Sequence, residues 1–304
     1  MKITNQGIWY FAKMLPEISK PFRLTLGEGK TAFSEKSGLY FKCEFLNPTG
    51  SIKDRGLCFQ ISKLAEKKVR HAVISSSGNA ALAASAYCRL AGIKLIVFVS
   101  PNINTAKLAA LKENSDVYID SRPVSSAHQY ALKNNFYNLR QSTDPNAAYG
   151  FETVSFEIDE EIGRIDDLFL AVSSGTALKG MADGFKESGY LPRFHAVQTA
   201  KIYPLAGQFD TDFIRENTSL ADAIVARTLP REGELLKIIR KSGGFGWVIP
   251  NNDMQNARSA LLKMGLDSSF EGAAAYAAVE KAKSKGFSLG KTVVILTGKY
   301  YPDE

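Results

Sequence analysis

Short apolar runs rich in β-branched residues alternate along this chain with longer segments of helical periodicity. The runs are Leu39 to Cys43, Ala72 to Ser75, Lys94 to Val99, Val117 to Ile119, Leu168 to Val172, Phe194 to Thr199, Gly246 to Ile249 and Thr292 to Leu296. Their apolar residues are largely consecutive rather than alternating with polar ones, which is typical of strands buried on both faces. The rhythm therefore predicts an α/β fold with mostly parallel sheets covered by helices.

Segments of helical periodicity fill the intervals between these runs. They are Leu57 to Ala65, Asn79 to Ala91, Asn104 to Asn114, Gly175 to Lys186 and Asn251 to Met264. The turn-rich stretch Ser142 to Asn146 interrupts the rhythm near the middle of the chain, and we expect a domain crossing there. The predicted division puts 1–40 with 146–304 in a larger domain and 41–145 in a smaller one.

Composition and charge set limits on the class of protein. The chain has 304 residues, of which 45% are hydrophobic and 23% charged, as in a soluble globular protein. Its net charge is +7, but the densest basic clusters, Lys67 to Arg70 and Lys281 to Lys285, end helical patterns, where cations are favoured. Because no basic stripe interleaved with aromatic residues is present, we expect no nucleic-acid partner.

Three cysteines, Cys43, Cys58 and Cys88, lie in apolar segments, and none has a metal-ligand spacing with another cysteine or a histidine. We interpret them as core thiols and expect no metal site. The residues from 1 to 20 lack the continuous apolar stretch of a signal peptide, and no apolar run is long enough to span a bilayer. We therefore expect a cytoplasmic protein without a membrane partner.

Lys53 follows the first of the predicted central strands, in the segment from Asn47 to Gly56. The Pro-Thr-Gly turn leads into a helix that Ser51 is predicted to cap, which places Lys53 in its first turn. The positive end of the helix dipole destabilises an ammonium there, so Lys53 could be unusually nucleophilic. An exposed lysine at a helix start is the simpler interpretation of this segment taken alone.

Hydroxyl and glycine residues follow two more predicted strands. Ser75-Ser76-Ser77-Gly78-Asn79 runs directly into an alanine-rich helix, and Ser173 to Gly180 opens another. Small residues and free N–H groups at a helix start can bind a carboxylate or a phosphate, although serines also cap helices routinely. Thr297 follows the last predicted strand, where a single hydroxyl is usually a turn residue.

The order of these segments resembles that of the threonine synthases. The segments that carry the resemblance are Glu28-Gly29-x-Thr31, Asn47 to Gly56, Ser77-Gly78-Asn79, Ser173 to Gly180, Glu271-Gly272-Ala273-Ala274 and Leu296-Thr297-Gly298. They extend from about Leu26 to Tyr300. The wider group that the chain resembles is the fold-type II enzymes of pyridoxal 5′-phosphate, the tryptophan synthase β superfamily, which includes cysteine synthases and serine/threonine dehydratases.

This resemblance implies two three-layer α/β domains, a cofactor in the cleft between them, and a homodimer. Lys53 would hold pyridoxal 5′-phosphate as a Schiff base and later move protons, Asn79 would bond to the ring hydroxyl, and Thr297 would face the pyridine nitrogen. The residues that would hold the cofactor phosphate are Ser173, Ser174, Gly175, Thr176 and Ala177. Those that would bind the carboxylate of a small amino-acid substrate are Ser76, Ser77, Gly78, Asn79 and Ala80.

The chain departs from the family where the substrate's phosphate would be held. The family has a threonine directly after Ser-Gly-Asn and an arginine in a Ser-x-Asn-Pro-x-Arg stretch, whereas this chain has Ala80 and Ala147 there, with Asp144 in place of the asparagine. Charge-assisted contacts to phosphate are the strong ones, so phosphohomoserine is not the expected substrate. Glu271 has a separate explanation, because Ser268 to Glu271 is typical of a capping box.

Three functions follow as hypotheses. The first is a threonine synthase-like lyase that acts by elimination, with or without replacement, because a threonine at the pyridine nitrogen makes the ring a weaker electron sink than an aspartate would. The second is a β-replacement synthase or a serine/threonine dehydratase. The third is a relative that binds an amino acid but has lost catalysis.

Overall fold

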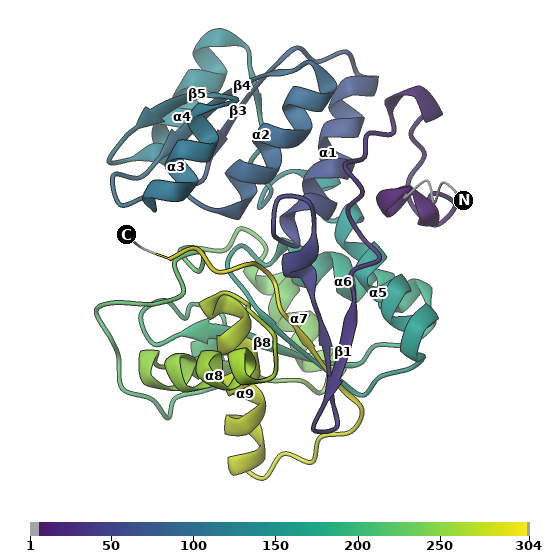
Figure 1. Cartoon of the computed structure of the whole chain (residues 1–304), viewed down its shortest axis with the longest axis vertical. Coiled ribbons are helices and arrows are strands. Elements are labelled where there is room, and N and C mark those ends of the chain that lie inside the picture. The colour runs from purple at the N-terminus through teal and green to yellow at the C-terminus, as the bar shows by residue number, and fades with distance from the viewer. Residues whose placement is uncertain (1–5, 303–304) are drawn as a thin grey trace. The chain divides into compact units, whose positions relative to one another are not determined.

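The computed structural model describes residues 6–302 of the chain, which divide into two compact units (Figure 1). The first unit consists of Asn47–Gly150 together with the described residues up to Gly29 and those from Tyr301 onward. The second unit consists of Lys30–Leu46 and Phe151–Tyr300. Each unit has its own sheet, and both sheets are mostly parallel, so the α/β class predicted from the sequence is confirmed.

These units differ from the predicted division in the placement of the N-terminal segment. The sequence groups 1–40 with 146–304, whereas the described residues 6–29 belong to the first unit. The buried carboxylate of Glu28 explains this, because it accepts a hydrogen bond of 2.7 Å from the Tyr87 hydroxyl and one of 3.2 Å from the Ile8 N–H. The Glu66 carboxylate likewise accepts hydrogen bonds from the N–H and the hydroxyl of Ser19, at 2.8 and 2.9 Å.

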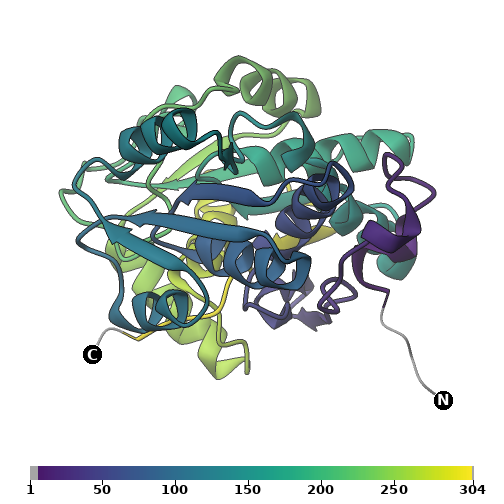
Figure 2. The same ribbon diagram turned by 90° about the horizontal axis from the view of Figure 1, so that it is seen from above.

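The first unit contains a parallel four-stranded sheet in the order β5-β4-β3-β6, whose strands run side by side in Figure 2. The strands are β3 (His71–Ser75), β4 (Lys94–Val99), β5 (Asp116–Ile119) and β6 (Tyr137–Asn138), and the helices are α1 (Lys53–Glu66), α2 (Asn79–Ala91), α3 (Thr105–Lys112) and α4 (Pro123–Asn134). Short 3-10 helices of this unit lie at Gly7–Phe11, Lys20–Phe22 and Pro145–Ala147.

Helices cover both faces of this sheet. Val73, Ile96 and Phe98 pack against Ala127 and Ala131 of α4. Because neighbouring side chains of a strand point to opposite faces, the residues between them face α2, which also packs against α1 and α3. The alanines of α2 allow this close approach. Gly92 ends the helix in the left-handed region, at φ +64°, as the sequence predicts.

The second unit contains a six-stranded sheet in the order β1-β2-β10-β7-β8-β9, in which only the pair β1-β2 is antiparallel. The strands are β1 (Phe33–Lys36), β2 (Leu39–Lys42), β7 (Asp167–Ala171), β8 (Arg193–Thr199), β9 (Gly246–Ile249) and β10 (Thr292–Ile295). The helices are α5 (Tyr149–Ile162), α6 (Thr176–Glu187), α7 (Glu232–Ser242), α8 (Asn251–Lys263) and α9 (Phe270–Ser284), with 3-10 helices at Glu44–Leu46 and Ala206–Gln208.

A buried polar network lies towards the amino ends of β7, β8 and β9. Trp247 Nε1 donates to His195 Nδ1 at 3.1 Å, so the His195 Nε2 carries the hydrogen that bonds to Asp167 Oδ1 at 3.0 Å. Arg193 donates to the same carboxylate. Burial lowers the pKa of His195, which therefore stays neutral inside the sheet. The network links three neighbouring strands at the sheet edge opposite to the loops considered below.

The three cysteines are buried and unpaired, which agrees with their interpretation as core thiols. Among residues 6–302, no group of three or more His, Cys, Asp or Glu side chains is arranged to hold a metal ion. In the same range, none of the helices combines the length and the apolar character needed to cross a membrane.

Candidate active site

Lys53 is the first residue of α1, and its side chain is half-buried. Burial lowers its pKa from 10.5 to about 8, because removal of water disfavours the ammonium. A lysine of this kind has a substantial neutral fraction near physiological pH, and the neutral amine is the nucleophilic form. The structure therefore places a reactive amine at the helix start that the sequence singles out.

The local cap of α1 differs from the prediction. Ile52, not Ser51, occupies the cap position, and the Ser51 hydroxyl accepts a hydrogen bond of 3.3 Å from the Lys53 N–H from one residue further out. Asp54 adds a second constraint, since its carboxylate accepts from both the N–H and the hydroxyl of Thr49, at 2.8 and 2.5 Å. These two hydrogen bonds from Thr49 to Asp54 fix the turn that precedes Lys53.

The loop Ser76–Ala80 connects β3 to α2. Gly78 caps α2, and no side chain satisfies the first N–H groups of the helix, which therefore remain donors for an anion. The serine hydroxyls brace the loop instead: Ser76 Oγ accepts from the Gly78 N–H at 3.2 Å, and Ser77 Oγ accepts from the Ser100 N–H at 2.7 Å. A Cβ added at Gly78 would meet nothing within 4 Å, so there is open space beside the loop.

Asn79 is the first residue of α2, and its Oδ1 is buried without a hydrogen-bond partner. Such atoms are rare in native structures, because a buried polar group without a partner costs about 1–3 kcal/mol. The two ends of the amide are interchangeable in assignment, so the group can offer either a donor or an acceptor. Asn79 thus points to a polar ligand.

Lys53 and Asn79 lie at the same edge of the first unit. The helix α2 begins directly after β3, at the carboxyl end of that strand, and α1 runs from this edge to the amino end of β3. The two helices pack against each other, so their first turns are neighbours. In α/β sheets this is the edge at which ligands bind.

The loop Ser173–Ala177 connects β7 to α6 in the second unit. Gly175 caps α6 at φ +79°, a conformation that favours glycine, and a Cβ there would lie 2.2 Å from the Leu235 Cδ1. Ser174 and Thr176 share a hydrogen bond of 3.1 Å, and Ser173 Oγ accepts from the Val225 N–H at 3.3 Å. As in α2, the cap position has no side-chain hydrogen bond, and a helix start of this kind is suited to an anion.

Thr297 follows β10, the neighbour of β7 in the same sheet. The register pairs Val294 with Phe169, and continued by three residues it sets Thr297 opposite Val172, next to Ser173. The Gly298 carbonyl accepts hydrogen bonds from the Ser269 N–H at 2.8 Å and from the Ser268 hydroxyl at 3.2 Å. Thr297 and the Ser173 loop thus follow neighbouring strands at the same edge of this sheet.

Glu271 does not cap α9, although its sequence context is that of a capping box. Ser269 occupies the cap position without a side-chain bond. The buried Glu271 carboxylate instead accepts a hydrogen bond of 2.9 Å from the Ala223 N–H, 48 residues away. Burial and then the nearby carboxylate of Asp222 raise the pKa of Glu271. Sequence spacing could not reveal this tether, because its partner is a backbone group in a long loop.

Asp144 is buried and its carboxylate is fully engaged in the first unit. It accepts hydrogen bonds from the Tyr137 hydroxyl at 2.6 Å, from Gln60 Nε2 at 2.5 Å and from the Asn146 N–H at 2.7 Å. Ala147, which replaces the family's arginine, is also fully buried. The two positions at which the resemblance predicts contacts to a substrate phosphate thus hold a fully engaged carboxylate and a packed methyl group.

In each unit, the residues singled out suit one part of a phosphorylated aldehyde cofactor. The uncapped start of α6 and the hydroxyls beside it are suited to a phosphate, and the Lys53 amine is suited to an aldehyde. The Asn79 amide offers a buried polar atom for a ring substituent. Each of these features belongs to residues that the sequence singled out.

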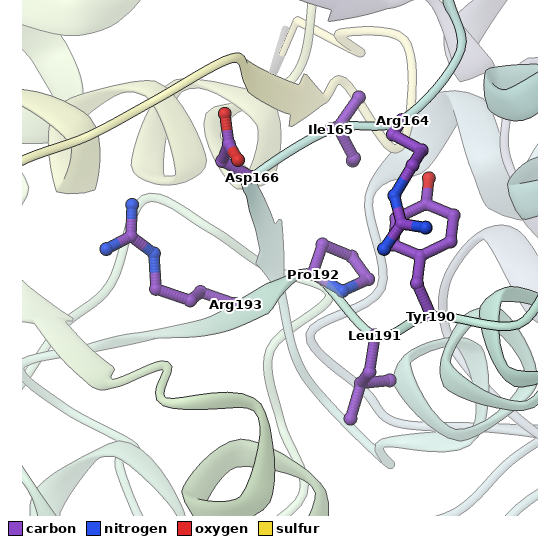
Figure 3. Close-up of a pocket in the computed structure, with 7 residues that line it drawn as sticks. All are labelled: Arg164, Ile165, Asp166, Tyr190, Leu191, Pro192 and Arg193. Atoms are coloured by element: carbon purple, nitrogen blue, oxygen red, sulfur yellow. The ribbon is translucent and has the colours of Figure 1, made fainter.

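A pocket of about 390 Å³ opens elsewhere in the second unit, at the amino ends of β7 and β8, and is lined by Arg164–Asp166 and Tyr190–Arg193 (Figure 3). Its charged groups already have partners. The Arg164 guanidinium lies over the Tyr190 ring, 4.4 Å from the centroid, and Asp166 accepts from the Lys291 N–H at 2.7 Å. We do not assign the chemistry to this pocket, because no nucleophile lines it and the candidate loops follow the opposite ends of the strands.

Comparison with known proteins gives a consistent result. Residues 24–298 match the family described as "Pyridoxal-phosphate dependent enzyme". The threonine synthase of Methanosarcina acetivorans is 26% identical over 98% of this chain and 80% of its own length, and the catabolic L-threonine dehydratase of Escherichia coli is 24% identical over 88% and 84%. Among solved structures, maize serine racemase superposes with a TM-score of 0.80 at 20% identity, covering 90% of this chain and 89% of its own.

Proposed function

Because this chain belongs to the family of pyridoxal-phosphate-dependent enzymes, we propose that it is a lyase that acts on a small, unphosphorylated α-amino acid by elimination, alone or followed by replacement. The observation that carries the proposal is the half-buried Lys53 amine, whose pKa is lowered to about 8, at the same sheet edge as the buried Asn79 Oδ1, which has no hydrogen-bond partner.

The cofactor, when bound, withdraws electrons from the substrate's α-carbon and so makes its proton acidic. Lys53 would bind the cofactor's aldehyde and, once displaced by the substrate amine, would take the α-proton as a neutral base. Asn79 would bond to the ring hydroxyl, and Ser173, Ser174, Gly175, Thr176 and Ala177 would hold the phosphate. The N–H groups and hydroxyls of Ser76, Ser77, Gly78, Asn79 and Ala80 would hold and orient the substrate carboxylate.

Thr297 would determine which reaction follows. A neutral hydroxyl can donate to the pyridine nitrogen or leave it unprotonated, but it cannot stabilise a pyridinium as a carboxylate does. Loss of a β- or γ-substituent then competes well with the proton transfers of transamination.

The surroundings of Asp144 support a substrate without a phosphate. A phosphate at this position would meet a buried carboxylate and the methyl group of Ala147 where the family has an arginine, and Ala80 supplies no hydroxyl. Removing a charge-assisted contact and adding a like charge both weaken anion binding. A serine/threonine dehydratase or a β-replacement synthase is therefore a second candidate, which this observation favours over a synthase that uses phosphohomoserine.

The cofactor assignment is tested by absorbance and by mass spectrometry. The purified protein should be yellow, and borohydride reduction should leave the cofactor mass on the peptide that contains Lys53. Lys53→Ala should abolish both signals, whereas the control variant Lys94→Ala, in the same unit at the start of β4, should retain them. An unchanged colour and a labelled peptide elsewhere in Lys53→Ala would refute the role of Lys53.

Turnover assays separate the candidate reactions. A dehydratase should release ammonia and a 2-oxo acid from serine or threonine. A replacement synthase should release them only slowly and, when a thiol or another nucleophile is added, should form a new amino acid that keeps the amino group. Phosphohomoserine should give no threonine. Threonine and inorganic phosphate formed at a rate comparable with the other reactions would contradict the substrate assignment.

A further inference from the structure

The segment Tyr301–Pro302 belongs to the first unit, although it follows Thr297 by only a few residues. The Pro302 carbonyl accepts a hydrogen bond of 3.2 Å from Asn104 Nδ2, and the Lys107 Nζ lies 5.0 Å from the centroid of the Tyr301 ring. Asn104 caps α3, since its Oδ1 accepts from the Lys107 N–H at 3.1 Å. The segment is thus held at the first turn of α3.

The charge of Asp54, in the first turn of α1, also acts on Tyr301. Burial, followed by the carboxylate of Asp54, raises the pKa of Tyr301 to about 12, so its hydroxyl stays protonated at physiological pH. Asp54 is the residue after Lys53, and its buried carboxylate is fixed by Thr49. The half-buried Tyr301 ring thus lies at the first turn of α3, within electrostatic range of the first turn of α1.

The order of the helices determines what lies between these two contacts. The helices α1, α2 and α3 all begin at the carboxyl edge of the four-stranded sheet, and α2 packs against both of the others. The loops before α2 and α3 are also joined directly, since the Ser77 hydroxyl accepts from the Ser100 N–H at 2.7 Å, so Tyr301 lies at the same sheet edge as the first turn of α2. That turn carries Asn79 and the loop Ser76–Ala80.

We propose that Tyr301 contacts the substrate's side chain beside the loop Ser76–Ala80 and restricts the enzyme to small, uncharged amino acids that carry a hydroxyl group. This inference rests on the function proposed above and adds a residue that determines specificity. The ring limits the length of the side chain that fits, and the phenolic O–H, a neutral donor, bonds to a substrate hydroxyl. The family's motifs end before this position, so the resemblance does not assign Tyr301 a role.

Two substitutions at Tyr301 separate the effect of the ring from that of its hydroxyl. In the holoenzyme, the change in cofactor absorbance on titration with serine, alanine and leucine gives an apparent Kd for each. Tyr301→Phe should weaken serine relative to alanine by about fivefold, the value of one hydrogen bond, and leave the discrimination against leucine unchanged. Tyr301→Ala should also improve leucine relative to alanine by about tenfold or more.

Two further variants serve as controls. Tyr300→Phe changes the adjacent tyrosine, whose ring lies 3.7 Å from the Arg258 guanidinium, and should leave all three ratios unchanged. Asn104→Asp retains the acceptor that caps α3 but removes the donor to Pro302, so it should shift the ratios in the direction of Tyr301→Ala. Because Asn104→Asp leaves Tyr301 in place, it tests the proposal even if Tyr301→Ala folds poorly. Hydrogen exchange of the Tyr301 amide should slow when serine binds.

The outcomes distinguish this inference from the function on which it rests. If the wild-type protein binds the cofactor and responds to amino acids, but Tyr301→Ala and Tyr301→Phe have wild-type ratios, the role of Tyr301 is refuted and the proposed function stands. If the wild-type protein shows no cofactor absorbance, or none that changes with any amino acid, both proposals are refuted.

Discussion

The lowered pKa of Lys53 can be measured directly by labelling lysines at different pH values. A fall from 10.5 to about 8 is about 2.5 pH units, or about 3 kcal/mol in favour of the neutral amine. At pH 7 about one Lys53 side chain in ten would be neutral, against about one in 3,000 for an unperturbed lysine. Because only the neutral amine reacts with an acyl anhydride, the labelling of Lys53 should reach half its maximum near pH 8.

Trace acetylation of the cofactor-free protein, followed by mass spectrometry of the peptides, reports every lysine in one experiment. Lys94 is the internal control, because its hydrogen bond and ion pair with Asp116, at 3.1 Å, raise its pKa. Its labelling should still be rising at pH 10.5. For each lysine, the pH at which labelling is half-maximal is compared rather than the labelling rate, because burial also slows access of the reagent to Lys53. A midpoint for Lys53 that coincides with that of Lys94 would show that the reasoning from burial is wrong.

The remaining predictions concern Asn79 and His195. Asn79→Ala should leave the thermal midpoint of the cofactor-free protein unchanged or raise it, because the substitution removes a partnerless buried oxygen, and should weaken cofactor binding about tenfold in an absorbance titration. A clear loss of stability without the cofactor would contradict this. His195→Leu should lower the free energy of unfolding in urea by about 3 kcal/mol, because Trp247 Nε1 loses its acceptor and Asp167 a donor, while the folded variant should still bind cofactor. The pKa of His195 is lower in the folded protein than in the unfolded chain, so the unfolded chain binds a proton more readily. The wild-type protein should therefore lose stability as the pH falls below about 6.5, the pKa of an unperturbed histidine. His195→Leu should lack this contribution to the pH dependence.

The sequence predicted the positions of strands and helices most closely where apolar runs or glycines mark their ends. The predicted runs coincide with strands to within a residue at each end, because consecutive apolar residues leave a buried parallel strand few alternatives. The helix α2 was predicted with its observed bounds, because Gly78 and Gly92 delimit an alanine-rich stretch. By contrast, the two-residue strand β6 and the half-exposed strand β1 carry no apolar signal of their own.

The site was predicted less completely than the fold. Motif order identified Lys53, Asn79 and the Ser173 loop as candidates, and the local geometry of each is consistent with its proposed role. It could not identify contacts that depend on long-range packing. The Glu271 carboxylate appeared to belong to a capping box but binds the Ala223 backbone, and Tyr301 gave no signal because its neighbours, Asp54 and Lys107, are distant in sequence.

The hydrogen bonds around Asp144 have a consequence for how this enzyme could be re-engineered. Restoring a phosphate site by Ala147→Arg alone would force a guanidinium into a fully packed position beside a carboxylate that is already satisfied by Tyr137, Gln60 and Asn146. Replacing Asp144 first would leave those donors without an acceptor. Each of these single substitutions should therefore destabilise the protein, and a phosphate site would require several side chains to change together. On the proposed function, a change of substrate at this position would therefore depend on several side chains together rather than on one residue.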